Sequence, residues 1–129
     1  MKYLIALLML LVLNSCTNAL IEEPNDLLGS WQEQSMHHHT IIFNDDNTID
    51  GMWWENAKYS YKNSNVTIIY DYMTEQNIKM STVKWVCQYN INNDTLQLTT
   101  ISYEYKIGDN STWVEEQGSS GITLYYIRK

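Results

Sequence analysis

The chain has 129 residues, which leaves room for one domain rather than two. Its formal net charge is −7, and −8 without Lys2 of a cleavable leader, which argues against nucleic acid as a partner. Ten Tyr and five Trp stand against a single Phe, and the chain has one Pro. This mixture favours pleated, half-buried strands over helices, so the composition predicts an all-β domain.

The first fifteen residues have the pattern of a secretory leader. Lys2 supplies the positive charge, and residues 3–13 form an apolar run of eleven residues, too short to span a bilayer and typical of a signal-peptide core. The run ends in Leu13-Asn14-Ser15-Cys16, which resembles the lipobox of bacterial lipoproteins. In that family the leader is cut before the Cys, which is then acylated. The resemblance implies a lipoprotein signal peptide over residues 1–15 and Cys16 as the lipidation site.

The segment from Cys16 to residue 26 is polar and without hydrophobic periodicity, which predicts a flexible tether. Several acyl chains would anchor the protein in a membrane without a transmembrane helix. Thr17, rather than Asp, follows Cys16, and in lipoproteins of double-membrane bacteria this implies the outer membrane. We therefore expect a lipid-anchored protein of the cell envelope. The alternative is an ordinary secretory signal in which Cys16 is incidental.

Acylation of Cys16 would leave Cys87 alone, so no intramolecular disulfide is expected. Cys87 lies on the apolar side of an alternating segment, residues 83–91. This position predicts a buried, inert thiol rather than a nucleophile.

Period-two alternation of apolar and polar residues runs through the rest of the chain and is typical of half-buried strands. We predict eight strands, near residues 28–34, 37–43, 48–54, 58–62, 66–72, a long strand ending at Ile91, 95–107 and 122–128. A shift in the apolar phase predicts a β-bulge near Thr99 and Thr100. The last strand is available to pair with the first.

An internal repeat supports this division. Residues 59–68 and 89–98 share one pattern of a strand, a tight polar turn and a second strand, with apolar positions in the same register. Two hairpins of one design are what an up-and-down meander requires.

Gly29-Ser30-Trp31 begins the first predicted strand. A Trp at this position can plug one end of a small barrel, and a Gly before it lets another backbone approach closely. The segment resembles the Gly-x-Trp of the lipocalin superfamily. The two hairpins and the closing residues 124–128 resemble small bacterial lipocalin-like lipoproteins.

This resemblance covers residues 27–129 and implies an eight-stranded antiparallel up-and-down barrel. In lipocalins a late Arg packs over the first-strand Trp, and by position Arg128 is that residue. Asn47 stands where the turn after Phe43 usually has Gly. Asn tolerates positive φ, so we expect the turn to be kept. A barrel of this size either encloses one small ligand or is filled by its own side chains.

The predicted interior is rich in aromatic side chains that carry polar groups, each of which needs a partner when buried. By alternation the interior positions are Phe43, Trp53, Tyr59, Tyr61, Ile68, Tyr70, Trp85, Tyr89 and Tyr103. The same alternation turns Trp54 outward. We expect a partly open mouth suited to a flat or amphipathic ligand and lined by Trp53, Tyr61, Tyr70 and Trp85.

The function predicted on this basis is the binding of a small apolar or aromatic ligand without catalysis. The alternative is an accessory or inhibitor lipoprotein with a filled barrel that acts through protein–protein contacts. The volume of the interior distinguishes the two. An enzyme is the third interpretation, and the sequence has no Gly-x-Ser-x-Gly, phosphate-loop or Cys-x-x-Cys motif to support it.

His37 and His39 would share one face of a strand and could form half of a Zn or Cu site. No third ligand is identifiable, and the alternative is a polar strand end with solvated imidazoles. We therefore predict no metal and no other cofactor.

Overall fold

The computed structural model describes residues 25–35, 37–51, 54–108 and 111–129. Cys16 and Trp53, two of the predicted functional residues, lie outside these ranges. Within them every regular element is a strand, and no helix there has the length and apolar character needed to cross a membrane.

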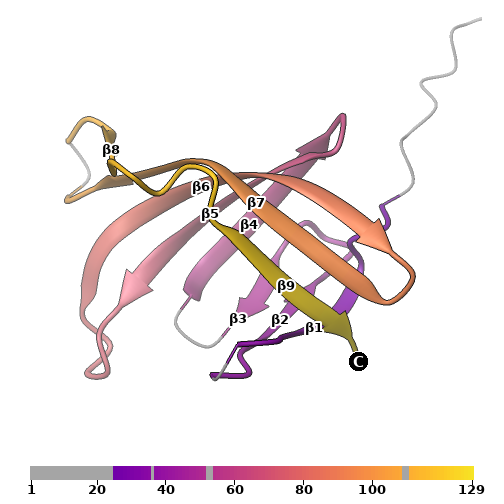
Figure 1. Ribbon diagram of the computed structural model, residues 1–129. Helices are drawn as coiled ribbons and strands as arrows, with labels where there is room; N and C mark the ends of the chain where they lie inside the picture. The colour runs from indigo at the N-terminus through magenta and orange to yellow at the C-terminus, as the bar shows by residue number, and fades with distance from the viewer. Residues whose placement is uncertain (1–24, 36, 52–53, 109–110) are drawn as a thin grey trace, which may run out of the picture.

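The strands of the described residues are β1 (Gly29–Glu33), β2 (Thr40–Phe43), β3 (Ile49–Gly51), β4 (Trp54–Lys62), β5 (Asn65–Met73), β6 (Lys79–Asn92), β7 (Thr95–Lys106), β8 (Val114–Glu115) and β9 (Thr123–Arg128). Neighbours in the sheet follow the order β6-β5-β4-β3-β2-β1-β9-β7-β8, and β6 also pairs with β7. This pairing closes the sheet on itself (Figure 1). The short β8 is added to β7 beyond the stretch that pairs with β9. The predicted eight-stranded antiparallel barrel is confirmed.

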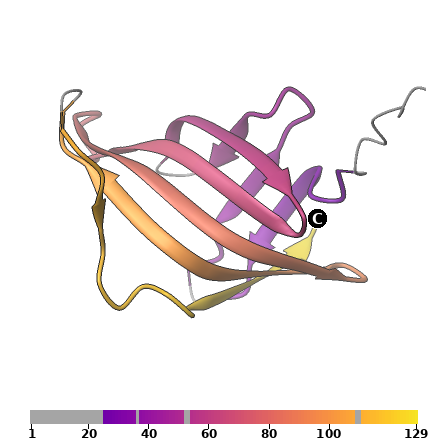
Figure 2. The same cartoon turned by 90° about the horizontal axis from the view of Figure 1, so that it is seen from above.

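The barrel has two different ends. At one end lie the hairpin turns at residues 44–48, 63–64 and 93–94, together with the C-terminus and the start of β1. At the other end lie the loops at residues 34–39 and 74–78 and the long connection that carries β8. The view from above shows that connection reaching away from the hairpin end (Figure 2). We call these the closed end and the open end.

Tight turns with left-handed backbone form the closed-end hairpins. Asn63 and Ser64 join β4 to β5 with φ angles of 51° and 62°, and Asn93 begins the β6–β7 turn with φ 54°. Such angles match the twist of paired strands in two-residue hairpins. After Phe43, Asn47 adopts φ 65°, as expected for an Asn in the place of Gly.

The bulge predicted from the phase shift lies in β7. Val86 pairs with Ser102 whereas Cys87 pairs with Thr100, so Ile101 is the extra residue. The bulge returns Thr100 to the interior, where it is buried, and leaves Ile101 exposed. Cys87 is itself fully buried.

The strand predicted near residues 48–54 is not continuous, because it contains β3 and the first residue of β4. The chain does not continue extended through residues 48–54, because β3 ends at Gly51 and β4 begins at Trp54, with these two residues paired. The inference that Trp54 faces outward is therefore wrong, since its ring packs against the core. A Cβ atom on Gly51 would lie 3.0 Å from Trp54 Cε3, so Gly51 leaves room for the ring.

The second predicted strand is shorter than expected. It begins at Thr40 rather than near His37, because His38 has a φ of 47° and interrupts the extended backbone. His37 and His39 therefore precede β2 and lie in the loop at the open end.

Trp31 fills the closed end. Its side chain is completely buried, and its Nε1 donates a hydrogen bond of 2.7 Å to the carbonyl oxygen of Leu27. The guanidinium of Arg128 lies over the indole ring, with Cζ 4.2 Å from the ring centroid, and Nη1 donates to the Leu28 carbonyl oxygen at 2.9 Å. Gly29 has φ +117°, and a Cβ there would lie 3.2 Å from Arg128 Nη1. The close neighbour of Gly29 is thus a guanidinium and not another backbone.

Candidate ligand-binding cavity

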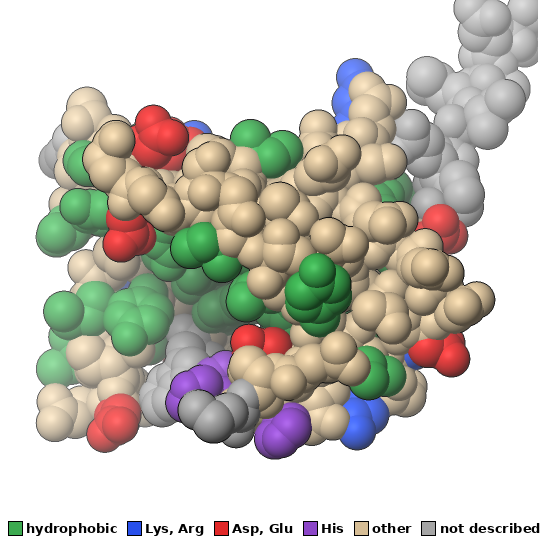
Figure 3. Space-filling model, in the orientation of Figure 1, with side chains coloured by type: hydrophobic (Ala, Val, Ile, Leu, Met, Phe, Trp, Pro, Cys, Tyr) green, Lys and Arg blue, Asp and Glu red, His purple; other side chains and the backbone are tan. Residues whose placement is uncertain are grey.

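A cavity of about 450 Å³ occupies the interior at the open end of the barrel. Apolar side chains gather at this end and lie recessed behind a rim (Figure 3). Every barrel strand except β3 contributes to the wall, which is formed by Glu33, His39, Thr40, Ile41, Trp54, Tyr70, Trp85, Thr100, Tyr103, Glu116, Gln117, Gly118, Ser119, Ile122, Leu124 and Tyr126.

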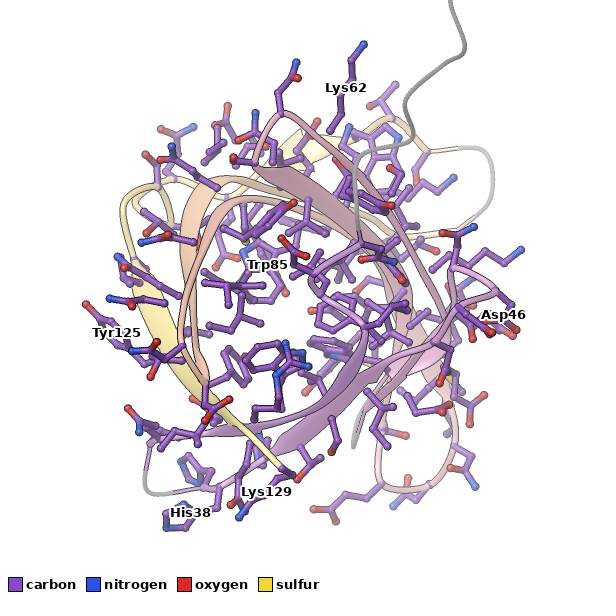
Figure 4. The ribbon with its side chains drawn as sticks, turned by 90° about the vertical axis from the view of Figure 1, so that its right-hand side faces the viewer. His38, Asp46, Lys62, Trp85, Tyr125 and Lys129 are labelled. Atoms are coloured by element: carbon purple, nitrogen blue, oxygen red, sulfur yellow. The ribbon has the colours of Figure 1, made fainter. Side chains whose placement is uncertain are left out.

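One wall is aromatic and is built by neighbouring strands. Trp54 of β4 stacks on Tyr70 of β5, with ring centroids 4.7 Å apart and planes 26° apart. Trp54 also meets Trp85 of β6 edge to face, at 6.3 Å and 73°. Seen along the barrel axis, Trp85 lies within the ring of strands, whereas Tyr125 lies outside it (Figure 4). Stacked and edge-to-face pairs hold one another in place, so this wall is largely pre-formed.

The polar atoms of the aromatic wall have partners within the protein. The hydroxyls of Tyr70 and Tyr103 are 3.1 Å apart and share a hydrogen bond. Trp85 Nε1 donates to Thr100 Oγ1 at 2.9 Å. Burial, with a smaller contribution from Tyr103, raises the pKa of Tyr70, so its hydroxyl stays neutral. The wall therefore presents ring faces to the cavity and has few unsatisfied groups.

The facing wall is polar and comes from β1, β9 and the residue before β2. Trp31 points into the interior, so Glu33, two residues later on β1, points the same way. Tyr126 of β9 is the cross-strand partner of Glu33 and is 3% exposed. His39 Nδ1 lies 3.7 Å from Glu33 Oε2. Burial raises the pKa of Tyr126, and the nearby Glu33 adds to the shift.

The rim includes the loop that follows β8. Glu116 donates its backbone N–H to the Tyr103 carbonyl oxygen at 2.8 Å, and Ser119 Oγ donates to the Glu116 carbonyl oxygen at 2.9 Å. Just before β8, the Trp113 ring has the Nζ atoms of Lys84 and Lys106 at 4.8 Å and 5.1 Å from its centroid. These contacts hold the rim to the long strands β6 and β7.

The structure places the predicted site residues in different regions. Tyr70 and Trp85 line the cavity. Tyr61 is not brought to it, because it pairs with Val66 beside the closed-end turn and stacks on Tyr59 at 6.3 Å. Seven residues of strand separate Tyr61 from Trp54, which is roughly 20 Å. Trp53 lies outside the described residues.

Trp54, Glu33 and Tyr126 are among the cavity residues that were not predicted from the sequence. Trp54 was assigned to the outer face because the chain reversal after Gly51 could not be recognised. Glu33 could have been found from its spacing of two residues after the buried Trp31. Tyr126 could have been found in the same way, since it precedes Arg128 by two residues in the strand that pairs with β1.

The two histidines do not form a metal centre with other residues of the described ranges. The rings of His37 and His39 stack with centroids 5.4 Å apart. Among the described residues, no group of three or more His, Cys, Asp or Glu side chains is arranged to hold a metal ion.

Fold and cavity together define a class: a small antiparallel β-barrel, closed at one end by a Trp–Arg pair and hollow at the other, consistent with a lipocalin-like domain. No family model, curated protein or solved structure matches the sequence of this chain.

Proposed function

We propose that this protein is a non-catalytic, lipocalin-like barrel that binds one small aromatic or amphipathic ligand in the open-end cavity. The observation that carries the proposal is the cavity of about 450 Å³, a size typical of small-molecule sites, with the stacked wall of Trp54, Tyr70 and Trp85. The alternative, a filled barrel acting through protein contacts, requires a packed interior and is less well supported.

A binding role rather than catalysis fits the chemistry of the wall. Trp85 and Tyr70 already use their polar atoms in hydrogen bonds to neighbours, which orients them for contact with a ligand. Burial raises the pKa of the Cys87 thiol to about 12, so it remains protonated and inert. We therefore expect the cavity to hold its ligand without changing it.

The test fills the cavity from within. Leu124 lines the cavity on β9, and Ile127 lies on the outer face of the same strand, 41% exposed. Leu124→Trp should abolish the fluorescence increase of the neutral dye Nile red on binding. Ile127→Trp, which adds the same ring outside, should leave it unchanged. Thermal melting of both variants shows that they are folded.

Equal dye binding by wild type and Leu124→Trp would contradict binding in the cavity. Native mass spectrometry of the protein purified from its own host provides the second measurement. A retained small molecule, absent from Leu124→Trp, would identify the ligand directly.

We also propose that acyl chains on Cys16 hold the protein in the cell envelope, at the outer membrane. Support comes from the apolar run and the lipobox-like residues before Cys16. Cys16→Ala should move the protein out of the membrane fraction and abolish labelling with radioactive palmitate. Ser15→Ala keeps a small residue before Cys16 and is the matched control. Equal labelling of wild type and Cys16→Ala would disprove the anchor.

A further inference from the structure

The described part of the cavity lining contains carboxylates but no Lys or Arg. Among its described lining residues are the carboxylates Glu33 and Glu116 and the imidazole of His39, and neither Lys nor Arg. The fixed charges of this lining are therefore negative. An anionic ligand would find no fixed cation in this lining.

Glu33 is the more deeply placed carboxylate. Its side chain is 13% exposed, and Nδ1 of the His39 imidazole lies 3.7 Å from its Oε2. That separation is longer than a hydrogen bond, which needs about 3 Å. A carboxylate withdrawn from water is costly unless a donor or a positive charge accompanies it.

The hydroxyl of Tyr126 is a second polar group beside Glu33. Tyr126 is 3% exposed and lines the cavity, and it is the cross-strand partner of Glu33 in the β1–β9 pair. Within the described ranges its hydroxyl makes no hydrogen bond, whereas those of Tyr70 and Tyr103 bond to each other. Because Tyr126 lines the cavity and its hydroxyl is bonded to no protein group of those ranges, this hydroxyl is available to a group inside the cavity.

The aromatic wall stands across the cavity from this pair. In the closed ring of eight strands β1 and β5 are four strands apart in either direction, so Glu33 on β1 faces the side that carries Tyr70 on β5. The faces of aromatic rings carry negative electrostatic potential and attract cations. Carboxylate, free hydroxyl and ring faces thus converge on one volume.

We propose that the cavity selects organic cations: an ammonium group held between Glu33 and the ring faces of Trp54 and Tyr70, on a body that is aromatic or apolar. The ammonium donates to the Glu33 carboxylate and to the oxygen of Tyr126. The body stacks on the aromatic wall. This inference rests on the proposed function, because it names the charge of the ligand that the same cavity takes.

Three probes with one aromatic body isolate the charge. Naphthylethylamine, naphthylethanol and naphthylpropionate differ in carrying a positive, no or a negative charge, and each is titrated into the protein by calorimetry at pH 8. We expect the amine to bind at least about tenfold more tightly than the alcohol, as a desolvated cation on ring faces allows. The propionate should bind most weakly.

Charge variants show which carboxylate selects the amine. Glu33→Gln should weaken binding of the amine by about tenfold and change binding of the alcohol by no more than about twofold. Glu115→Gln is the control, because Glu115 is exposed on β8 and does not line the cavity. It removes the same charge near the same end and should change neither affinity.

The outcomes separate this inference from the proposed function. If the alcohol binds as tightly as the amine, or if Glu33→Gln weakens both equally, selection for cations is overturned while ligand binding stands. The same holds if Nile red binds and none of the naphthyl compounds does. If neither the dye nor any naphthyl compound binds, the proposed function itself fails.

Discussion

The closed and open ends of the barrel are both built from aromatic side chains, but their neighbours differ. At the closed end Trp31 is fully buried, with Arg128 on its face and the Leu27 carbonyl on its Nε1. At the open end Trp54 and Trp85 border a cavity of about 450 Å³. The closed-end residues fill space, and the open-end residues surround it.

The difference follows from how the side chains are packed at each end. At the closed end two of the hairpin turns have only two residues, and the buried Trp31 stands at the centre, so little room remains between the strands. At the open end the rings of Trp54 and Tyr70 stack along the wall rather than across the interior. Residue type alone therefore does not separate a structural aromatic residue from a ligand-binding one. Their neighbours do.

The largest expected effect tests this contrast directly. Trp31→Ala removes a fully buried side chain and should lower the free energy of unfolding by about 3–5 kcal/mol. Trp54→Ala removes the same ring from a half-buried wall and should cost about 1–2 kcal/mol while weakening ligand binding. Urea denaturation measures both. Equal losses would show that the two ends do not differ in packing.

Arg128 should matter at the closed end only. Arg128→Ala removes the guanidinium from the Trp31 face and two hydrogen bonds, to the carbonyl oxygens of Leu28 at 2.9 Å and Asp26 at 3.2 Å. We expect a loss of about 2 kcal/mol in urea denaturation. Dye binding at the open end should stay the same. A fall in dye affinity without a change in stability would contradict the separation of the two ends.

A smaller effect is expected inside the cavity. Tyr70→Phe removes one hydroxyl and its bond to Tyr103, so the free energy of unfolding should fall by no more than about 1 kcal/mol. Binding of a ligand should weaken severalfold, since the Tyr103 hydroxyl loses its fixed orientation. Tyr72→Phe, on the same strand and 46% exposed, is the control and should change neither property. Unchanged binding by Tyr70→Phe would place the ligand away from this wall.

The smallest effect concerns acid on the outer surface near the open end. Partial burial opposes ionisation of Asp71, but Lys79, Asn56 and Thr82 outweigh it and lower the pKa of Asp71. A lowered pKa adds stability above the ordinary value of 3.8, and this stability is lost as the pH falls through the lowered value.

For this partly exposed group the contribution is less than about 1 kcal/mol. Wild type should therefore be slightly more stable than Asp71→Asn at neutral pH, and the two unfolding curves should converge in acid. A constant difference from neutral pH to acid would show that Asp71 acts through packing rather than charge.

The sequence determined the fold closely because alternation is a local property. Each barrel strand was visible as a period-two pattern, and the turns were marked by Asn and Asp, of which Asn47, Asn63 and Asn93 adopt left-handed backbone. The bulge in β7 was visible because one extra residue reverses the apolar phase. Closure of the barrel between β1 and β9 agrees with the expectation that the last strand is available to pair with the first.

The cavity was decided by tertiary structure, because a cavity is a relation between walls from distant parts of the sequence. Alternation placed Tyr70 and Trp85 inside, but it could not show that Tyr61 packs at the opposite end. Nor could it show that Trp54 turns inward after the chain reverses at Gly51. Glu33 was not singled out from the sequence, and only the closed ring of strands sets its carboxylate beside Tyr126 and opposite the aromatic wall.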